Sequence, residues 1–317
     1  MNDVLLEEIR SLITDAQRIL VTTHVRPDGD AIGSLLGLGL SLQVAGKEVQ
    51  MVLDDVVPAS LRHLVGGQQI NHEAKSAFDL SIVVDCSDIK RIGICFEGIS
   101  APDLNIDHHP TNENYGKHNL VEVSASATTE MLAEFIPLWG LPVTKDVASA
   151  LLTGLITDTL GFRTSSVTSK TMRIAADLID QGAEMSDLYI RSMVQRSFEA
   201  ARLWGSGLSQ LEREGPIVWT RLSLQDRQEA GYHGRDDADL INVLSAIKDA
   251  SIAIIFIEQP SGSIKVSWRA QPGLDVARLA TQFGGGGHAA AAGAEVQGSM
   301  DDVMPHILKV TQGLLVN

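Results

Sequence analysis

The stretch Leu104-Asn-Ile-Asp107-His108-His109-Pro110 joins a short apolar run to a carboxylate and two imidazoles. The same form occurs twice upstream. Val21-Thr-Thr-His24-Val-Arg-Pro-Asp28-Gly-Asp30 places His and Asp after one apolar run, and Leu80-Ser-Ile-Val-Val-Asp85 ends another on a single carboxylate. Short apolar runs of this kind are typical of buried parallel strands. Because ligands bind outside the carboxyl ends of the strands in an open parallel sheet, we expect these side chains to meet there.

Helices alternate with these strands along the first two thirds of the chain. We expect strands at 18–23, 49–53, 80–84 and 104–106, and helices at 4–17, 29–44, 126–139, 144–157, 168–181 and 186–214. Gly33, Gly37 and Gly39 are expected to bring their helix close to the sheet. Strands that alternate with helices predict a parallel α/β sheet.

The pattern changes after residue 214. Strands are expected at 217–221, 252–258 and 264–269, and helices at 223–230, 236–248, 274–283 and 301–315. We therefore predict an α/β protein with a parallel-sheet domain at 1–190 that carries helices on both faces. A helical connector at 191–213 and a smaller α/β domain at 214–317 follow.

Composition limits the classes of partner. The 317 residues carry a formal net charge of -15, which repels long polyanions, so long duplex nucleic acid is not an expected partner. Of the two cysteines, Cys86 and Cys95, the first is expected to be a buried, inert thiol, and a reducing compartment fits both. We see neither a basic leader nor an apolar run of bilayer length, and we expect a cytoplasmic protein without membrane attachment.

Acidic and imidazole side chains at the predicted strand and helix ends form a candidate metal site. The candidate ligands are His24, Asp28, Asp30, Asp85, His108 and Asp158, with Asp107 and His109 beside them. Four carboxylates with two imidazoles suit Mn²⁺ better than Mg²⁺, and Mg²⁺ and Co²⁺ remain alternatives. One cation does not need so many anionic ligands, so we expect two ions with Asp85 as the bridge. A two-metal site is suited to phosphoryl transfer.

Each of these residues also has an ordinary structural explanation. Asp28-Gly-Asp30 alone fits a turn and a helix N-cap, and Asp107 or Asp158 alone fits the end of an element. The combination at several strand ends favours the metal site.

A glycine run, Gly284-Gly-Gly-Gly-His288, marks the second domain. It lies between a predicted helix and a small-residue strand, where a flexible linker is uncommon. Backbone amides without Cβ atoms can approach a phosphate closely. His288 adds a donor, and Arg269 can bind a phosphate through two N–H groups or stack on a base. We therefore expect this domain to bind an anion.

These motifs together resemble a known family. His24-x-x-x-Asp28-x-Asp30, Asp85, Asp107-His108-His109 and Asp158 are similar to the four motifs of the DHH phosphoesterases. The Arg269 strand and the glycine run resemble the DHH-associated C-terminal domain. The resemblance covers almost the whole chain and is greatest for the stand-alone NrnA type, which comprises oligoribonucleases (nanoRNases) and 3′-phosphoadenosine 5′-phosphate phosphatases. Leu160 adds one residue to the fourth motif, where Thr-Asp-Thr-Gly is usual.

The resemblance implies a role for each residue of the first domain. One Mn²⁺ would be held by His24, Asp28 and Asp85, and the other by Asp30, Asp85, His108 and Asp158. Asp107 would orient a ligand, His109 would face the scissile phosphate, and Arg163 would help to bind that phosphate.

In the second domain, the resemblance implies that Arg269, Gly285, Gly286 and His288 hold the far end of the substrate. The implied reaction is hydroxide attack on a phosphate ester. It would release nucleoside 5′-monophosphates from very short RNA, or AMP from 3′-phosphoadenosine 5′-phosphate.

Several alternatives stay open. A pyrophosphatase would share the first domain but should carry a cluster of Lys and Arg in the second. Hydrolysis of linear or cyclic dinucleotides fits the same motifs. A nucleotide-sensing module without turnover is the non-enzymatic alternative, against which the intact ligand set argues. Short RNA or nucleotides are thus the expected partners, and a homodimer is common among similar proteins.

Overall fold

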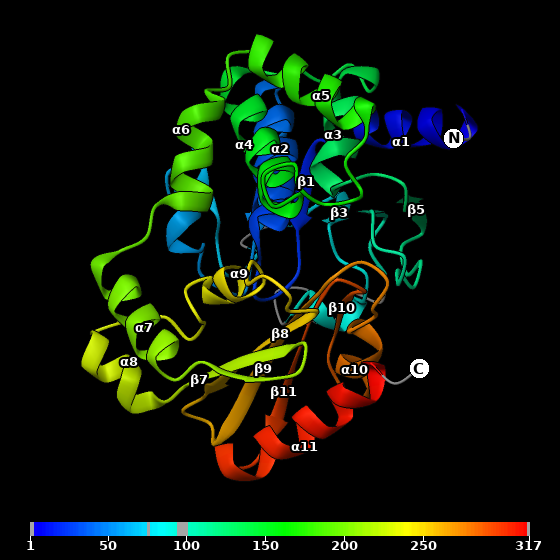
Figure 1. The fold of residues 1–317 in the computed structure, drawn as a ribbon. Helices are drawn as coiled ribbons and strands as arrows, with labels where there is room; N and C mark the ends of the chain where they lie inside the picture. The colour runs from blue at the N-terminus through cyan, green and yellow to red at the C-terminus, as the bar shows by residue number, and fades with distance from the viewer. Residues whose placement is uncertain (1–2, 75–76, 94–100, 316–317) are drawn as a thin grey trace. The chain divides into compact units, whose positions relative to one another are not determined.

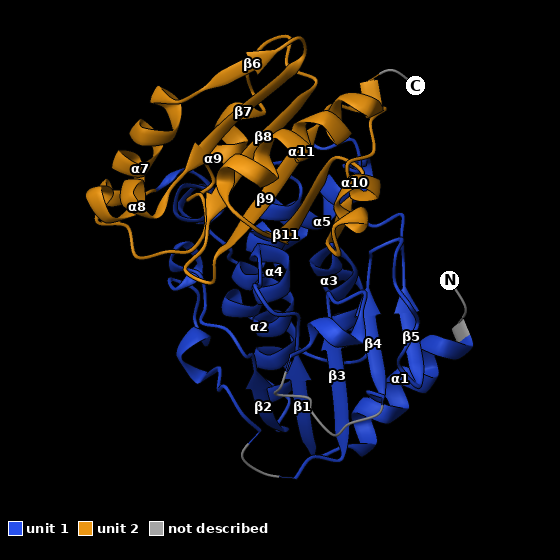
Figure 2. Cartoon of the chain, turned by 90° about the horizontal axis from the view of Figure 1, so that it is seen from below, with its two compact units in different colours: residues 1–195 blue, residues 196–317 orange. Residues whose placement is uncertain are grey.

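The computed structural model describes residues 3–74, 77–93 and 101–315, and the chain divides into two compact units at 1–195 and 196–317. Figure 1 shows the elements of the chain, and Figure 2 distinguishes the two units by colour.

A parallel five-stranded sheet forms the centre of the first unit, in the order β2-β1-β3-β4-β5 (Figure 2). Its strands are β1 (Arg18–Thr22), β2 (Glu48–Val52), β3 (Leu80–Val84), β4 (Leu104–Asp107) and β5 (His118–Val121). The sequence does not predict β5, which is an edge strand with one fully buried residue, Leu120. Because the order reverses between β1 and β3, the switch point where ligands bind lies at their carboxyl ends.

Long helices lie on one side of this sheet. They are α1 (Asp3–Asp15), α2 (Gly29–Val44), α3 (Thr128–Leu138), α4 (Lys145–Asp158) and α5 (Ser169–Asp180). Helix α2 contacts the strands, and α4 and α5 pack on other helices. The apolar side chains of these helices join Val21, Ile82 and Ile106 in the main core.

The other face of the sheet has a smaller cover. Leu20 and Val83 pack there with Cys86 and Ile92, and the helical element among the described residues is the 3₁₀ turn η3 (Ile89–Arg91). We expected helices on both faces, but this face also presents Ser81 and Asn105 and so offers less apolar area to a helix.

The glycines of α2 bring it close to α4 rather than to the sheet. A Cβ added to Gly33 would lie 2.7 Å from the Ala150 carbonyl oxygen, and one added to Gly37 would collide with Leu151. Gly39 alone of the three faces the sheet, where a Cβ would meet Met51 of β2. The close approach of α2 to α4 matters because each helix carries a candidate metal ligand.

The prediction of one long helix at 186–214 is wrong. In its place, α6 (Met185–Tyr189) runs into a π-helical turn at Ile190–Val194, and α7 (Phe198–Ser209) starts afresh from the N-cap Ser197. Residues 212–214 form β6 (Glu212–Glu214), which pairs with the next strand. Residues 196–213 thus lie in the second compact unit, and their role as a connector stays a prediction.

A mixed six-stranded sheet forms the second unit, in the order β10-β11-β9-β8-β7-β6. The remaining strands are β7 (Ile217–Leu222), β8 (Ile252–Glu258), β9 (Ser263–Ala270), β10 (Gly286–His288) and β11 (Ala291–Gln297). Helices α10 (Ala277–Gln282) and α11 (Met300–Gln312) cover one face, and α7, α8 (Leu224–Ala230) and α9 (Leu240–Leu244) cover the other. The predicted α/β class and the second, smaller α/β unit are confirmed.

Helix α9 is shorter than the expected 236–248. Ala238 and Asp239 both have positive φ, at 51° and 66°, and a helix cannot pass through that conformation.

Two expectations from composition concern membrane-spanning helices and the cysteines. No helix in the described ranges is long and apolar enough to cross a bilayer. Cys86 is buried, and burial raises the pKa of its thiol to about 12, as an inert thiol requires. Cys95 lies outside the described residues.

Candidate metal centre

Side chains from the ends of β1, β3 and β4 converge with the first turn of α2 at the switch point of the first unit. Three sets of ligand atoms there each lie within 4.8 Å of one another. The sets are His24, Asp28 and Asp85; Asp30, Asp85 and His108; and Asp85, Asp107 and His109. Asp85 belongs to all three.

Asp85 follows the last residue of β3 and is 1% exposed. Its Oδ2 lies 3.7 Å from His24 Nε2, and its Oδ1 lies 3.7 Å from His109 Nδ1 and 3.9 Å from His108 Nε2. Its backbone has a positive φ of 53°, which turns the chain sharply at the strand end. Each carboxylate oxygen faces a different imidazole, as a bridging ligand requires.

His24 presents Nε2 to Asp85, while its Nδ1 lies 2.9 Å from the Val25 carbonyl oxygen and 3.1 Å from Arg91 Nη2. A carbonyl only accepts and a guanidinium only donates, so Nδ1 cannot bond both. The tautomer in which Nδ1–H donates to Val25 leaves the Nε2 lone pair for a cation, which is the usual arrangement for a metal-bound His.

Asp28 and Asp30 lie at the start of α2. Asp28 Oδ1 caps the helix by accepting from the amides of Asp30 and Ala31, both at 3.1 Å. The N-cap explanation for Asp28 is therefore correct, but the cap uses one oxygen only and so is compatible with metal binding. Asp30 is buried, and burial and the charge of Asp85 raise its pKa to about 7.

The second imidazole, His108, lies among carboxylates. Its Nε2 is 3.6 Å from Asp158 Oδ2 at the end of α4 and 3.9 Å from Asp30 Oδ2. Burial, and then the charge of Asp30, hold the pKa of Asp158 well above its usual range. Several carboxylates at close range repel one another, and a bound cation would relieve that repulsion. The donor set therefore fits divalent metal ions.

His109 forms a pair with Asp107. Its Nδ1–H donates to Asp107 Oδ1 at 2.7 Å, and Asn112 Nδ2 donates to Asp107 Oδ2 at 2.5 Å. Burial opposes the charge on His109, but the bond to Asp107 and the nearby charge of Asp85 raise its pKa to about 9. Asp107 thus orients the His109 ring and favours its charged form.

Arg163, the other candidate near the substrate phosphate, is exposed, and its Nε donates to the Leu160 carbonyl within its own turn at 2.8 Å. The additional residue of this motif, Leu160, adopts a positive φ of 49°. The role of Arg163 stays a prediction.

In the second unit, Arg269 and His288 lie on the same face of the sheet. Ala291 of β11 pairs with Arg269 on one side and with His288 on the other. Side chains of directly paired residues point to the same face of a sheet, so these two cationic or donor groups are neighbours across β11.

The glycine run is a strand edge rather than a flexible linker. Gly284 follows the C-cap of α10, Phe283, with a positive φ of 71°. A Cβ on Gly285 would collide with the Gly293 carbonyl oxygen, whereas one on Gly286 would meet no atom within 4 Å. Gly285 is therefore needed for strand packing, and Gly286 is the glycine of the pair with open space at its Cα.

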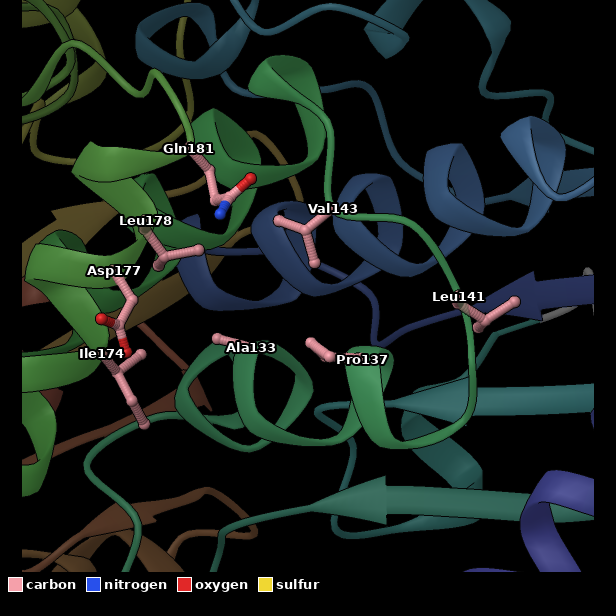
Figure 3. Close-up of a pocket in the computed structure, with 8 residues that line it drawn as sticks. All are labelled: Ala133, Pro137, Leu141, Val143, Ile174, Asp177, Leu178 and Gln181. Carbon is pink, nitrogen blue, oxygen red and sulfur yellow. The ribbon is translucent and has the colours of Figure 1, made fainter.

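A pocket of about 320 Å³ lies away from these residues, between α3, α5 and the segment that follows α3 (Figure 3). Its lining is mainly apolar and includes Ala133, Ile174 and Leu178. None of the candidate ligands lines it, so the metal centre is not this pocket.

Comparison with known proteins identifies the family. The model of the DHH family N-terminal domain matches residues 18–155, and that of the DHHA1 domain matches residues 216–317. A Thermus thermophilus protein named bifunctional oligoribonuclease and PAP phosphatase NrnA is 33% identical over 93% of this chain and 89% of its own length. The chain belongs to the DHH family. The expected resemblance is thus confirmed.

Two further proteins are similar to this DHH protein over most of its length. A Bacillus subtilis protein with the same name is 27% identical over 88% of this chain and 89% of its own. The crystal structure of an exopolyphosphatase-related protein from Bacteroides fragilis is 26% identical, with a TM-score of 0.91 over 100% of this chain and 98% of that one.

Residues that the sequence did not single out also contact the DHH motifs. Thr128 and Thr129 in the first turn of α3 bond to Asp85 and Asp30, and Asn112 bonds to Asp107. The paired threonines at the start of a predicted helix were a visible signal, but the carboxylates they meet lie far away in sequence.

Proposed function

We propose that this DHH protein is a metal-dependent phosphoesterase. Its substrates would be very short RNA, cleaved to nucleoside 5′-monophosphates, and 3′-phosphoadenosine 5′-phosphate, cleaved to AMP. The observation that carries the proposal is the position of Asp85, whose two oxygens face three imidazoles at the switch point of the sheet. The names of the two NrnA relatives support the choice of substrates.

The cofactor in this proposal is a pair of Mn²⁺ ions. One would be held by His24, Asp28 and Asp85, and the other by Asp30, Asp85, His108 and Asp158; both sets contain an imidazole and several carboxylate oxygens, which suit Mn²⁺. Such ions supply a hydroxide nucleophile near neutral pH and offset the charge of a phosphate.

The protein side chains would then hold the substrate. His109, oriented by Asp107 and raised in pKa to about 9, would hold the scissile phosphate through the charged imidazole. Arg163 would assist at that phosphate. Arg269, His288 and the open backbone at Gly286, with Gly285 beside it, would bind the remainder of the substrate in the second unit.

A substrate panel with Mn²⁺ tests the proposal. It comprises pApA, a five-nucleotide RNA, 3′-phosphoadenosine 5′-phosphate, cyclic-di-AMP and pyrophosphate. Release of AMP from the short RNAs or the bisphosphate supports the proposal and ranks its substrates. Turnover of pyrophosphate alone, or of cyclic-di-AMP alone, would favour the corresponding alternative, and binding without turnover would favour a nucleotide sensor.

The matched variants are Asp85→Asn and Asp180→Asn. Both remove one carboxylate from the first unit, but Asp180 is an exposed residue at the end of α5. Loss of turnover in the first variant only would tie the activity to the metal centre. The expected homodimer stays a prediction that light scattering on the full chain can test.

A further inference from the structure

The first turn of α3 is bonded to two of the candidate metal ligands. Thr128 and Thr129 are both fully buried there. We propose that Thr128 and Thr129 are positioning residues that fix which oxygens of Asp85 and Asp30 face the metal ions. The inference rests on the proposed metal-dependent function and goes beyond its ligand set.

Three hydrogen bonds from α3 restrict Asp30. Its Oδ1 accepts from the Thr129 amide at 2.9 Å and from the Thr129 hydroxyl at 2.6 Å, and its Oδ2 accepts from the Thr128 amide at 2.6 Å. A carboxylate has about four lone-pair sites, so Oδ1 is fully engaged. The remaining site is on Oδ2, which lies 3.9 Å from His108 Nε2. Asp30 would therefore bind a cation through Oδ2 alone.

One hydrogen bond from the same turn orients Asp85. The Thr128 hydroxyl donates to Asp85 Oδ1 at 2.9 Å. This bond fixes the rotation of the carboxylate, so that Oδ2 faces His24 while Oδ1 faces His108 and His109. The hydroxyl of Thr128 thus acts on the ligand shared by both ions, whereas that of Thr129 acts on a ligand of one ion.

The turn itself is fixed by its surroundings. Glu130, which is 2% exposed, accepts from the Ser126 amide at 3.1 Å and from the Thr171 hydroxyl at 2.9 Å, which ties the start of α3 to the start of α5. A Cβ on Gly154 of α4 would collide with the Thr129 methyl group, so that side chain is also packed closely. A rigid turn can hold the carboxylates in place without reorganisation when a metal binds.

The test is a metal titration of the full chain without substrate, with free Mn²⁺ followed by electron paramagnetic resonance. The wild type is expected to bind two ions. Partners that orient a metal ligand are typically worth about 10–100-fold in metal affinity. We expect Thr129→Val to lower the affinity for one Mn²⁺ ion by that factor and leave the affinity for the other unchanged. Thr128→Val should lower the affinity for both ions.

Two kinds of matched variant complete the experiment. Thr128→Ser and Thr129→Ser keep the hydroxyl and should therefore bind Mn²⁺ with wild-type affinity. Thr153→Val makes the same change at a buried threonine of α4 whose hydroxyl bonds to the Ser149 carbonyl of its own helix, and it should bind both ions normally. Thr128→Ala and Thr129→Ala remove the hydroxyl without a second methyl group and replace the valine variants if these do not fold.

The outcomes separate this inference from the proposed function. A wild type that binds two ions, with hydroxyl-free variants that bind them equally well, overturns the inference alone. Serine variants that fail to restore affinity also overturn it, because packing rather than the hydroxyl would then be responsible. A folded wild type that binds no divalent ion overturns both.

Discussion

Replacing Gly33 with alanine tests whether the close approach of α2 and α4 organises the metal centre. The new Cβ would lie 2.7 Å from the Ala150 carbonyl oxygen and 3.0 Å from the Cα and N of Gly154. All three contacts are with backbone atoms of α4, so no side chain can rotate away. The two helices must therefore move apart.

Two opposing effects set the magnitude. Alanine is favoured over glycine inside a helix by up to about 1 kcal/mol. Overpacking of a close contact costs about 1–3 kcal/mol. The net result is a destabilisation of about 1 kcal/mol, and in a unit of the size of residues 1–195 each kcal/mol shifts Tm by about 2–4 °C.

A second glycine provides the control. Gly205 lies inside α7, is exposed, and has no atom within 4 Å of an added Cβ. Gly205→Ala therefore gains helix propensity without a clash and should stabilise its helix by up to about 1 kcal/mol. The two variants make the same chemical change with opposite expected signs.

The assay is thermal unfolding of the full chain, with hydrogen exchange followed by mass spectrometry to locate the effect. Gly33→Ala should lower the free energy of unfolding and speed exchange in α2 and α4. Because Asp30 and Asp158 lie on these two helices, its Mn²⁺ affinity should fall as well. A Gly33→Ala variant as stable as the wild type, with unchanged exchange in α2 and α4, would refute the packing argument.

Asp85→Asn should lower kcat by about 100-fold or more, because it removes the charge that faces three imidazoles; near-normal turnover with intact folding would contradict the shared-ligand assignment. Arg269→Ala should raise KM for dinucleotides more than it lowers kcat. The control Lys265→Ala, on the same strand, should leave KM unchanged. Equal KM values for the two variants would show that Arg269 does not bind the substrate. In the metal-free protein the folded pKa values of Asp30, about 7, and His109, about 9, exceed the ordinary values of 3.8 and 6.5. The Asp30 contribution to stability should therefore be lost as the pH rises from 3.8 to about 7, and that of His109 as the pH rises from 6.5 to about 9, so that the free energy of unfolding falls between pH 6 and pH 9. Mn²⁺ should weaken the Asp30 part of this trend, because a cation bound to that carboxylate displaces its proton. A Tm that rises from pH 6 to pH 9 in a chelator would count against the pKa shifts.

Elements with strong local signals were predictable. The strands β3 and β8 and the helix α2 have the expected bounds, because continuous apolar runs and a glycine-rich helix with an Asp N-cap are encoded within a few residues. The helices expected to start at residues 144 and 168 do start there, and the structure shows that Thr144 and Thr168 cap them.

Elements without such signals were missed or misplaced. The strand β5 carries mixed polarity at a sheet edge, and the helical pattern after residue 185 does not reveal where the helix breaks. The glycines of α2 signalled a close approach, but the sequence could not say that the neighbour is α4 instead of the sheet.

The sequence by itself determined the kinds of metal ligand and their places at strand and helix ends, because apolar runs and the polar residues that end them are local features. The tertiary structure alone decided that the amides and hydroxyls of Thr128 and Thr129 meet Asp30 and Asp85. These residues lie 43 to 99 positions apart in the chain. Hydrogen bonds at such separations depend on how helices pack on the sheet, which no local pattern specifies.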